Sequence, residues 1–160
     1  MKPRARRTCT RLPKMDNLLT VEADVVWDGD MVFVARTDSH HFVTMDALPK
    51  DGGKNSGPRP MELVICALGG CTAMDVVAFL RKKQRTVEAV NVRVLGKRRQ
   101  FPPAIFEELT LDYRVRGPDL TEADVKWAVE LSIHKYCSVL AMVGHSARVI
   151  PRWTLEPPAD

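Results

Sequence analysis

Residues 58–84 read PRPMELVICALGGCTAMDVVAFLRKKQ, and this stretch decides the fold. Between residues 61 and 80, only Glu62, Thr72 and Asp75 interrupt a run of apolar and small side chains. A helix that is apolar on all sides is either a membrane span or the buried helix of a globular core. The two carboxylates in the run, and the amphipathic strand patterns elsewhere, favour the core helix.

The two ends of this stretch carry helix signals. Pro60 suits the first turn, where its missing N–H is not needed. Glu62 follows in the same turn, where the helix dipole favours a carboxylate, and this role alone explains its presence. Basic residues gather at the other end, where the dipole favours cations: Arg81, Lys82, Lys83 and Arg85.

Length and composition predict one soluble domain. The chain has 160 residues, of which 45% are hydrophobic and 28% charged, which are ordinary values for a soluble protein. The basic N-terminus is not followed by the apolar region of a signal peptide, so we expect a cytoplasmic protein and no membrane association. Thiols stay reduced there. The four cysteines, at positions 9, 66, 71 and 137, are therefore not read as a disulfide framework.

The positive charge is concentrated in an N-terminal arm, residues 1–17, which we expect to be disordered and to precede a domain at 18–156. Residues 1–14 hold six Lys and Arg side chains and no acid, and subtracting these six from the formal net charge of +4 leaves −2 for the rest. Such an arm can bind nucleic acid, but a tail without a partner is the simpler interpretation. Met15 is also a candidate translation start, which would remove most of the arm.

Alternating apolar and polar residues predict strands on both sides of the central helix. The first, residues 18–27, places Val21, Ala23, Val25 and Trp27 on one half-buried face, and Asp28-Gly29-Asp30 predicts a hairpin turn after it. A loop without apolar residues covers 49–60. Thr121 with Asp124 resembles a capping box that starts a second helix, which we expect to pass Cys137 and stop at Gly144. The other expected strands are 31–35, 41–46, 89–95, 105–115 and 146–155. The strand at 105–115 places Leu109, Leu111, Tyr113 and Val115 on one face.

This order of elements predicts an α+β fold with mostly antiparallel sheets around two long helices. Two helices are few for covering two groups of three strands, and the first helix is apolar on every face. A second copy of the chain could supply the missing apolar surface.

The cysteines of the first helix lie on different faces. Cys66 and Cys71 are about 140° apart around a helix, so they cannot bridge. We expect Cys66 to be a small core residue. Cys71 follows Gly69-Gly70, which permits close approach to the helix, and Asp75 shares its face. The simpler role for Asp75 is structural, bonded to backbone or to an Arg of the second helix.

Cys137 has His134 three residues before it, on the same face if the helix is continuous. His134 could then stabilise a thiolate. An alternative is a metal site formed by Cys71, Cys137, His134 and His145, although these residues lack the usual ligand spacing. By composition alone, each cysteine could also be buried and unreactive.

Three motifs resemble the OsmC/Ohr superfamily of osmotically inducible and organic hydroperoxide resistance proteins, and in detail its OsmC-like branch. They are PMEL at 60–63, ALGGCTAMDV at 67–76 and KYCSV at 135–139. The resemblance implies an intertwined homodimer with sites at the subunit interface. It also implies a thiol peroxidase, in which Cys71 attacks a hydroperoxide and becomes a sulfenic acid and Cys137 resolves it to a disulfide. An external dithiol would reduce the pair, with no metal or flavin cofactor.

The sequence departs from the peroxidases of this superfamily at one place. There a Glu directly follows the helix-start Pro and pairs with an Arg from an early strand. Here that position is Met61, with Glu62 one residue later, and no Arg matches; Arg36 and Arg59 are the nearest. We expect Glu62, His134 or Asp75 to assist Cys71. The alternative function is a non-catalytic dimer that binds a small apolar or thiol-containing ligand at its interface.

Overall fold

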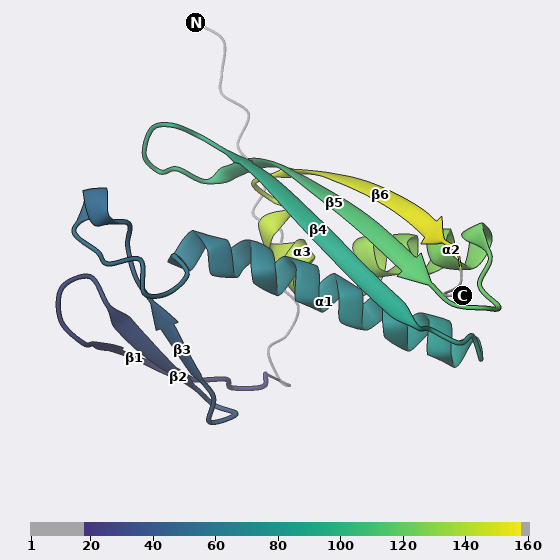
Figure 1. Ribbon diagram of the computed structural model, residues 1–160, viewed down its shortest axis with the longest axis horizontal. Coiled ribbons are helices and arrows are strands. Elements are labelled where there is room, and N and C mark those ends of the chain that lie inside the picture. Colours follow the sequence, from purple (N-terminus) through teal and green to yellow (C-terminus); the bar gives the residue numbers. More distant parts are fainter. Residues whose placement is uncertain (1–17, 158–160) are drawn as a thin grey trace, which may run out of the picture. The chain divides into compact units, whose positions relative to one another are not determined.

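The computed structural model describes residues 18–157, so the predicted arm at 1–17 lies outside the described residues. The chain divides into two compact units, with the boundary between Gly57 and Pro58. Both contain antiparallel strand pairs, and the second adds helices, which confirms the α+β prediction (Figure 1).

The first unit is a meander of three strands. β1 (Ala23–Trp27), β2 (Phe33–Thr37) and β3 (Phe42–Met45) pair antiparallel in that order. The predicted turn between β1 and β2 is present, with Gly29 at φ 89°, a conformation that glycine adopts without steric cost. The second strand begins at Phe33, two residues later than its sequence pattern suggested.

The half-buried pattern predicted for the first strand is wrong. All five residues of β1 are exposed, and Trp27 keeps 64% of its surface. In the described part of its unit, residues 18–57, the short 3₁₀ helix Pro49–Asp51 is the only helical structure. Alternation therefore predicted the strand correctly, but no element among residues 18–57 covers its apolar side.

A buried carboxylate organises the loop after β3. Asp46 is 2% exposed and accepts hydrogen bonds from the backbone N–H groups of Ala47, Lys54 and Ser56 and from the Ser56 hydroxyl. The Ser56 N–H is the main reason that the pKa of Asp46 falls to about 2. The Gly- and Pro-rich loop is thus folded around one side chain.

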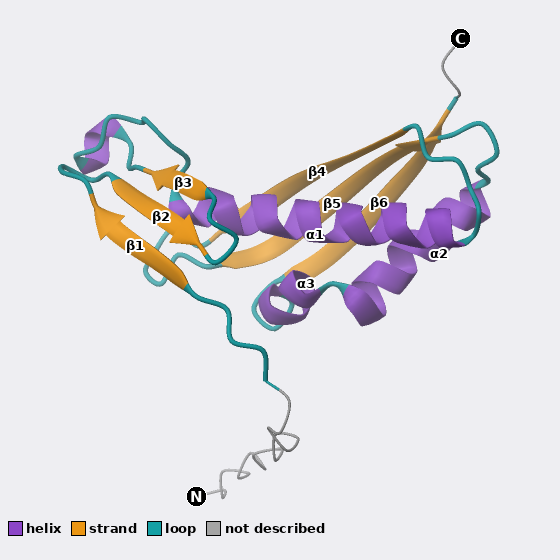
Figure 2. Ribbon diagram, turned by 90° about the horizontal axis from the view of Figure 1, so that it is seen from below, coloured by secondary structure: helices purple, strands orange, loops and turns teal. Residues whose placement is uncertain are grey.

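The second unit packs helices against one face of a three-stranded sheet (Figure 2). Its strands are in the order β4-β5-β6, with β4 antiparallel and β6 parallel to the central β5. The elements along the chain are α1 (Pro60–Lys82), β4 (Ala89–Arg98), β5 (Phe106–Arg116), α2 (Glu122–Leu131), the π-helix η2 (Ser132–Tyr136), α3 (Ser138–Val143) and β6 (Arg148–Glu156).

β5 supplies the centre of the core. Leu109, Leu111, Tyr113 and Val115 are fully buried, as their alternation predicted. Side chains from the helices close over them: Leu68, Val76 and Leu80 of α1, and Val125, Ala128 and Val129 of α2. Fully burying each large aliphatic side chain is worth about 1.5–3 kcal/mol, so this helix-facing side of the sheet dominates the stability of the unit.

The predicted capping box of the second helix is confirmed. The Thr121 hydroxyl accepts from the Asp124 N–H, and the Asp124 carboxylate accepts from the Thr121 N–H. Asp124 also forms ion pairs with Lys83 (2.8 Å) and Arg85 (3.1 Å), residues just beyond the end of α1. Bonding to Lys83 is the largest cause that lowers the pKa of Asp124 to about 2.

The second helix does not continue to Gly144, and this part of the prediction is wrong. α2 ends at Leu131, a π-helical turn follows, and Cys137 has a non-helical backbone (φ −68°, ψ 104°). A new helix, α3, then begins, and the Cys137 sulfur accepts a hydrogen bond from the Leu140 N–H (3.3 Å). Cys137 therefore acts as a helix cap, a role normally taken by short polar side chains.

Candidate active site

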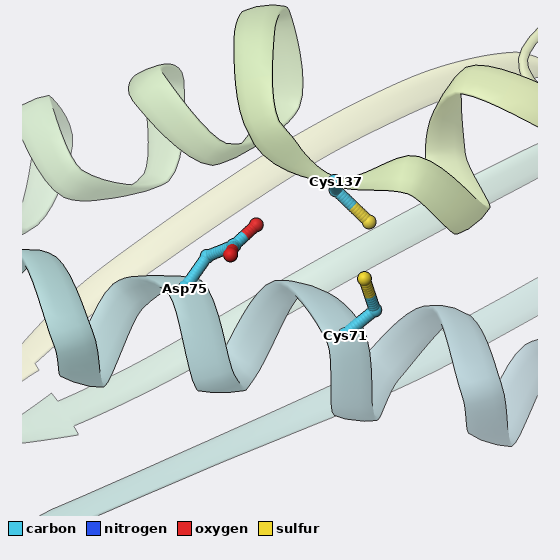
Figure 3. A group of neighbouring side chains, drawn as sticks. All are labelled: Cys71, Asp75 and Cys137. Carbon is cyan, nitrogen blue, oxygen red and sulfur yellow. The ribbon is translucent and has the colours of Figure 1, made fainter. Parts of the chain in front are cut away.

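Two cysteines from distant parts of the chain meet in the second unit. Cys71 lies in the middle of α1, and Asp75, one turn later, shares its face because residues four apart are neighbours on a helix. Figure 3 shows both side chains directed toward the chain at Cys137. The two sulfurs and a carboxylate oxygen of Asp75 all lie within 4.8 Å of one another.

Cys137 is the more buried of the two thiols. Its exposed fraction is 3%, whereas Cys71 is half-buried. Burial is the largest cause that raises the pKa of Cys137 to about 11, and Cys71 and Asp75 raise it further, while the Leu140 N–H opposes them. At neutral pH the Cys137 thiol therefore stays protonated.

Asp75 is held by a residue that the sequence did not single out. The hydroxyl of Ser132, the first residue of the π-helix, donates to Asp75 Oδ2 at 2.8 Å, and Ser132 is fully buried. The sequence suggested a backbone or Arg partner in the second helix. The partner is instead a serine hydroxyl in the π-helical turn directly after α2. A serine on a helix has too many ordinary roles for its sequence position to have revealed this one.

Tyr113 lies under the site with a buried hydroxyl. Burial raises the pKa of Tyr113 to about 12, and Asp75 and Cys137 contribute to the rise while Thr72 opposes it. The Tyr113 hydroxyl has no hydrogen-bond partner among the described residues. The Thr72 hydroxyl donates to the carbonyls of Leu68 and Gly69.

Glu62 is not brought to the sulfurs. It forms an ion pair with Arg59 and accepts from the Arg59 N–H, which closes a capping box at the start of α1. The bond from the Arg59 side chain is the main cause that lowers the pKa of Glu62 to about 2. Nine residues separate Glu62 from Cys71, which is about 13 Å along the helix axis. The half-buried Met61 packs against the core.

His134 does not join the site either. It is exposed in the π-helical turn, and within the described chain it makes no hydrogen bond or ion pair with Cys71, Cys137 or Asp75. The continuous helix that would have placed it above Cys137 is broken at that turn. His145 is exposed as well. The residues whose donor atoms could together hold a metal ion are Cys71, Asp75 and Cys137, not the histidine set considered from the sequence.

Cys66 was predicted to be a core residue, and this is wrong, because it is exposed. It lines a groove of about 310 Å³ between α1 and the edge strand β4, together with Ile65, Gly69, Gly70, Val92 and Val94. A Cβ on Gly69 would lie 3.0 Å from Val94, whereas one on Gly70 would meet open space. Only the first glycine of the pair thus serves close packing within this chain.

Much of α1 remains uncovered. A second groove, of about 500 Å³, continues along the helix and includes Met74, Val77 and Ala78. Only 28% of the most apolar part of α1 is buried. By length and composition the helix could cross a membrane, a criterion that the core helices of soluble proteins also meet.

The fold and the site together define an α+β protein with a pair of facing cysteines, one on a central helix and one at a helix cap. The sequence profile of OsmC-like proteins matches residues 53–151. The chain therefore belongs to the OsmC-like family, which confirms the resemblance inferred from its motifs.

Individual relatives agree with this assignment. Protein YhfA of Escherichia coli K12 is 36% identical over 129 residues, which cover 81% of this chain and 93% of YhfA. A hypothetical protein from Aquifex aeolicus is similar in structure, with a TM-score of 0.78, 31% identity and coverage of 88% of this chain and 98% of its own. An organic hydroperoxide resistance protein OsmC from Legionella pneumophila shares the fold, with a TM-score of 0.64, 14% identity and coverage of 87% and 99%.

Proposed function

We propose that the protein is a thiol peroxidase that reduces organic hydroperoxides. The observation that carries this proposal is the facing pair of sulfurs, within 4.8 Å of each other at the centre of the second unit. Membership of a family that includes proteins named for organic hydroperoxide resistance supports it. Hydrogen peroxide is a second candidate substrate.

The two sulfurs have different environments, and these support different roles for them. Cys71 is half-buried and can be reached by a peroxide, so it is the attacking thiolate. It takes the terminal oxygen of the hydroperoxide, becomes a sulfenic acid and releases an alcohol after proton uptake. Cys137 then attacks the Cys71 sulfur, a disulfide forms and water leaves. An external dithiol reduces this disulfide by two electrons and restores both thiols.

The working form is a homodimer in the cytoplasm, without a metal or flavin cofactor and without membrane or nucleic-acid partners. The support for the dimer is the open apolar side of α1, which has two adjoining grooves and an 18-residue window that is only 28% buried. Monomers rarely leave an apolar surface of this kind uncovered. A second copy of the chain is the occupant that family membership favours.

The test is peroxide consumption by purified protein with cumene hydroperoxide and dihydrolipoamide. Cys71→Ser is expected to abolish turnover, because Ser cannot form a sulfenic acid. Cys66→Ser is the matched control, since Cys66 lies on the same helix and is exposed; it should retain wild-type turnover. Equal turnover by wild type and Cys71→Ser would exclude the peroxidase.

One observation favours a second candidate, a non-catalytic dimer that binds a small apolar or thiol-containing ligand. The acid of the first turn, Glu62, is paired with Arg59 far from Cys71 and cannot assist it. Titration of the thiols distinguishes the two functions. Ordinary thiol reactivity of Cys71, with no peroxide-induced Cys71–Cys137 disulfide in the intact mass, would favour ligand binding.

A further inference from the structure

In the proposed peroxidase reaction, the roles of Cys71 and Cys137 do not account for one proton transfer, which occurs when the disulfide forms. When Cys137 attacks the Cys71 sulfenic acid, its thiol must lose a proton, and the departing hydroxide must gain one. Burial keeps the Cys137 thiol protonated, with a pKa of about 11, so spontaneous ionisation is rare at neutral pH. A nearby group that both accepts and returns a proton would therefore accelerate this step.

Asp75 is the carboxylate at the right place. Its donor atom lies within 4.8 Å of both sulfurs, a separation that one water molecule or a small side-chain rotation can bridge. Ser132 holds Oδ2 at 2.8 Å, and Figure 3 shows the carboxylate beside Cys137. The Tyr113 hydroxyl also lies near, but it is fully buried and its pKa is raised to about 12, so at neutral pH it keeps its proton and cannot act as the base.

Charge argues against a role for Asp75 in activating Cys71. A nearby carboxylate repels a thiolate. Asp75 therefore cannot stabilise the ionised Cys71 sulfur in the way that a positively charged Arg would. Its negative charge instead helps to keep Cys137 neutral until Cys71 has reacted. Once Cys71 is a sulfenic acid it carries no charge, and one source of repulsion against ionised Cys137 is removed.

We propose that Asp75 is the proton relay of the resolving step. Its carboxylate takes the proton of the Cys137 thiol as the S–S bond forms, and it delivers that proton to the hydroxide that leaves Cys71. The products are the Cys71–Cys137 disulfide and one water, and the carboxylate is regenerated. This inference rests on the proposed peroxidase function.

A single-turnover experiment tests the relay. Fully reduced protein is mixed with a slight excess of cumene hydroperoxide without dithiol, quenched with dimedone at increasing times, and analysed by intact mass. Asp75→Asn, which keeps an oxygen for the Ser132 hydroxyl, should form the Cys71 sulfenic acid at the wild-type rate. Its disulfide should form about a hundredfold more slowly, the lower end of the usual range for general acid–base catalysis.

Further variants separate a relay from a structural role. Asp112→Asn is the matched control, because Asp112 is a half-buried aspartate on β5 whose side chain alternates away from Leu111 and Tyr113; it should resolve at the wild-type rate. Asp75→Glu should recover part of the loss. In Asp75→Asn the resolving rate should rise with pH as hydroxide replaces the carboxylate, and thermal melting should show that the variant is folded.

Two outcomes overturn the relay while leaving the peroxidase intact. One is a wild-type rate of disulfide formation in Asp75→Asn, and the other is an equal slowing of sulfenic acid formation, which would place the effect on Cys71. If the wild-type protein forms neither a dimedone adduct on Cys71 nor a Cys71–Cys137 disulfide, the peroxidase itself fails and the relay fails with it.

Discussion

The first turn of α1 and its middle each carry one carboxylate, and the two are held in opposite ways. Glu62, in the first turn, is paired with the cation of Arg59 in a capping box. Asp75, in the middle, is held by the neutral hydroxyl of Ser132 and faces two sulfurs. The charge of a carboxylate in an ion pair is balanced by its partner. A hydroxyl carries no charge, so a carboxylate bonded to one still acts electrostatically on its other neighbours.

This difference separates stability from chemistry along one helix. The first turn satisfies backbone N–H groups that a helix start leaves without partners. The middle lies beside Cys137, at the point where the second helix breaks, and there two thiols and a carboxylate come together. In the peroxidases that the sequence resembles, an acid at the helix start serves the reactive cysteine. In this chain the acid of the first turn, Glu62, lies one residue later and caps the helix, and the carboxylate that lies near the sulfurs is Asp75.

The largest effect is expected at the site that faces the middle of α1, from Cys137→Ser. Dithiol-dependent turnover should fall to a few per cent of wild type or less, because the sulfenic acid on Cys71 can no longer be resolved within the chain. Dimedone labelling followed by intact mass should show the adduct accumulating on Cys71, and excess peroxide should drive it to the sulfinic acid. Undiminished turnover with dihydrolipoamide would mean that the dithiol attacks Cys71 directly.

An intermediate effect is expected on the open side of the same turns, from Met74→Glu. Met74 is 74% exposed in the single chain, so the fold should tolerate the charge, but a partner packed there would be repelled. Size-exclusion chromatography with light scattering should show a dimer for wild type and a monomer for the variant. Met142→Glu is the control, since Met142 is 69% exposed on α3; it should remain dimeric. A monomeric wild type would refute the proposed dimer.

The smallest effect is expected in the first turn, from Glu62→Gln. The folded-state pKa of Glu62 is lowered from 4.5 to about 2 by Arg59, so its contribution to stability is present above the unfolded-state value and is lost as pH falls toward 2. The variant should melt slightly below wild type at pH 7, and the difference should vanish near pH 2 and shrink in high salt. Peroxide turnover should be unchanged; a loss comparable to that of Cys137→Ser would place Glu62 in the chemistry after all.

Local patterns predicted the elements of the fold well. The alternation of Leu109, Leu111 and Tyr113 identified the buried face of β5, and the Thr121–Asp124 pair identified the start of α2. These predictions succeeded because period and capping are properties of neighbouring residues. Burial was harder to predict, since Cys66 and the strand β1 look apolar in the sequence and yet are exposed.

The candidate site was predicted in part. The motifs around Cys71 and Cys137 singled out both cysteines, and helical spacing placed Asp75 on the face of Cys71. The same spacing argument misled for His134, because it assumed a continuous helix where the structure has a π-helical turn. Ser132 could not be found from the sequence, since its role depends on the packing of that turn against α1.

The sequence by itself determined the α+β class, the long apolar helix with its two ends, and the identity of the groups able to react. Only the tertiary structure brought Cys137 close to Cys71, 66 positions away in the sequence. It also ended the second helix early, so that Cys137 caps a new one. It placed Glu62 in an ion pair at the helix start and Asp75 beside the two sulfurs. The physical reason is that hydrophobic period and capping act over one or two turns. The environment of a thiol or a carboxylate is instead set by whatever the fold packs against it.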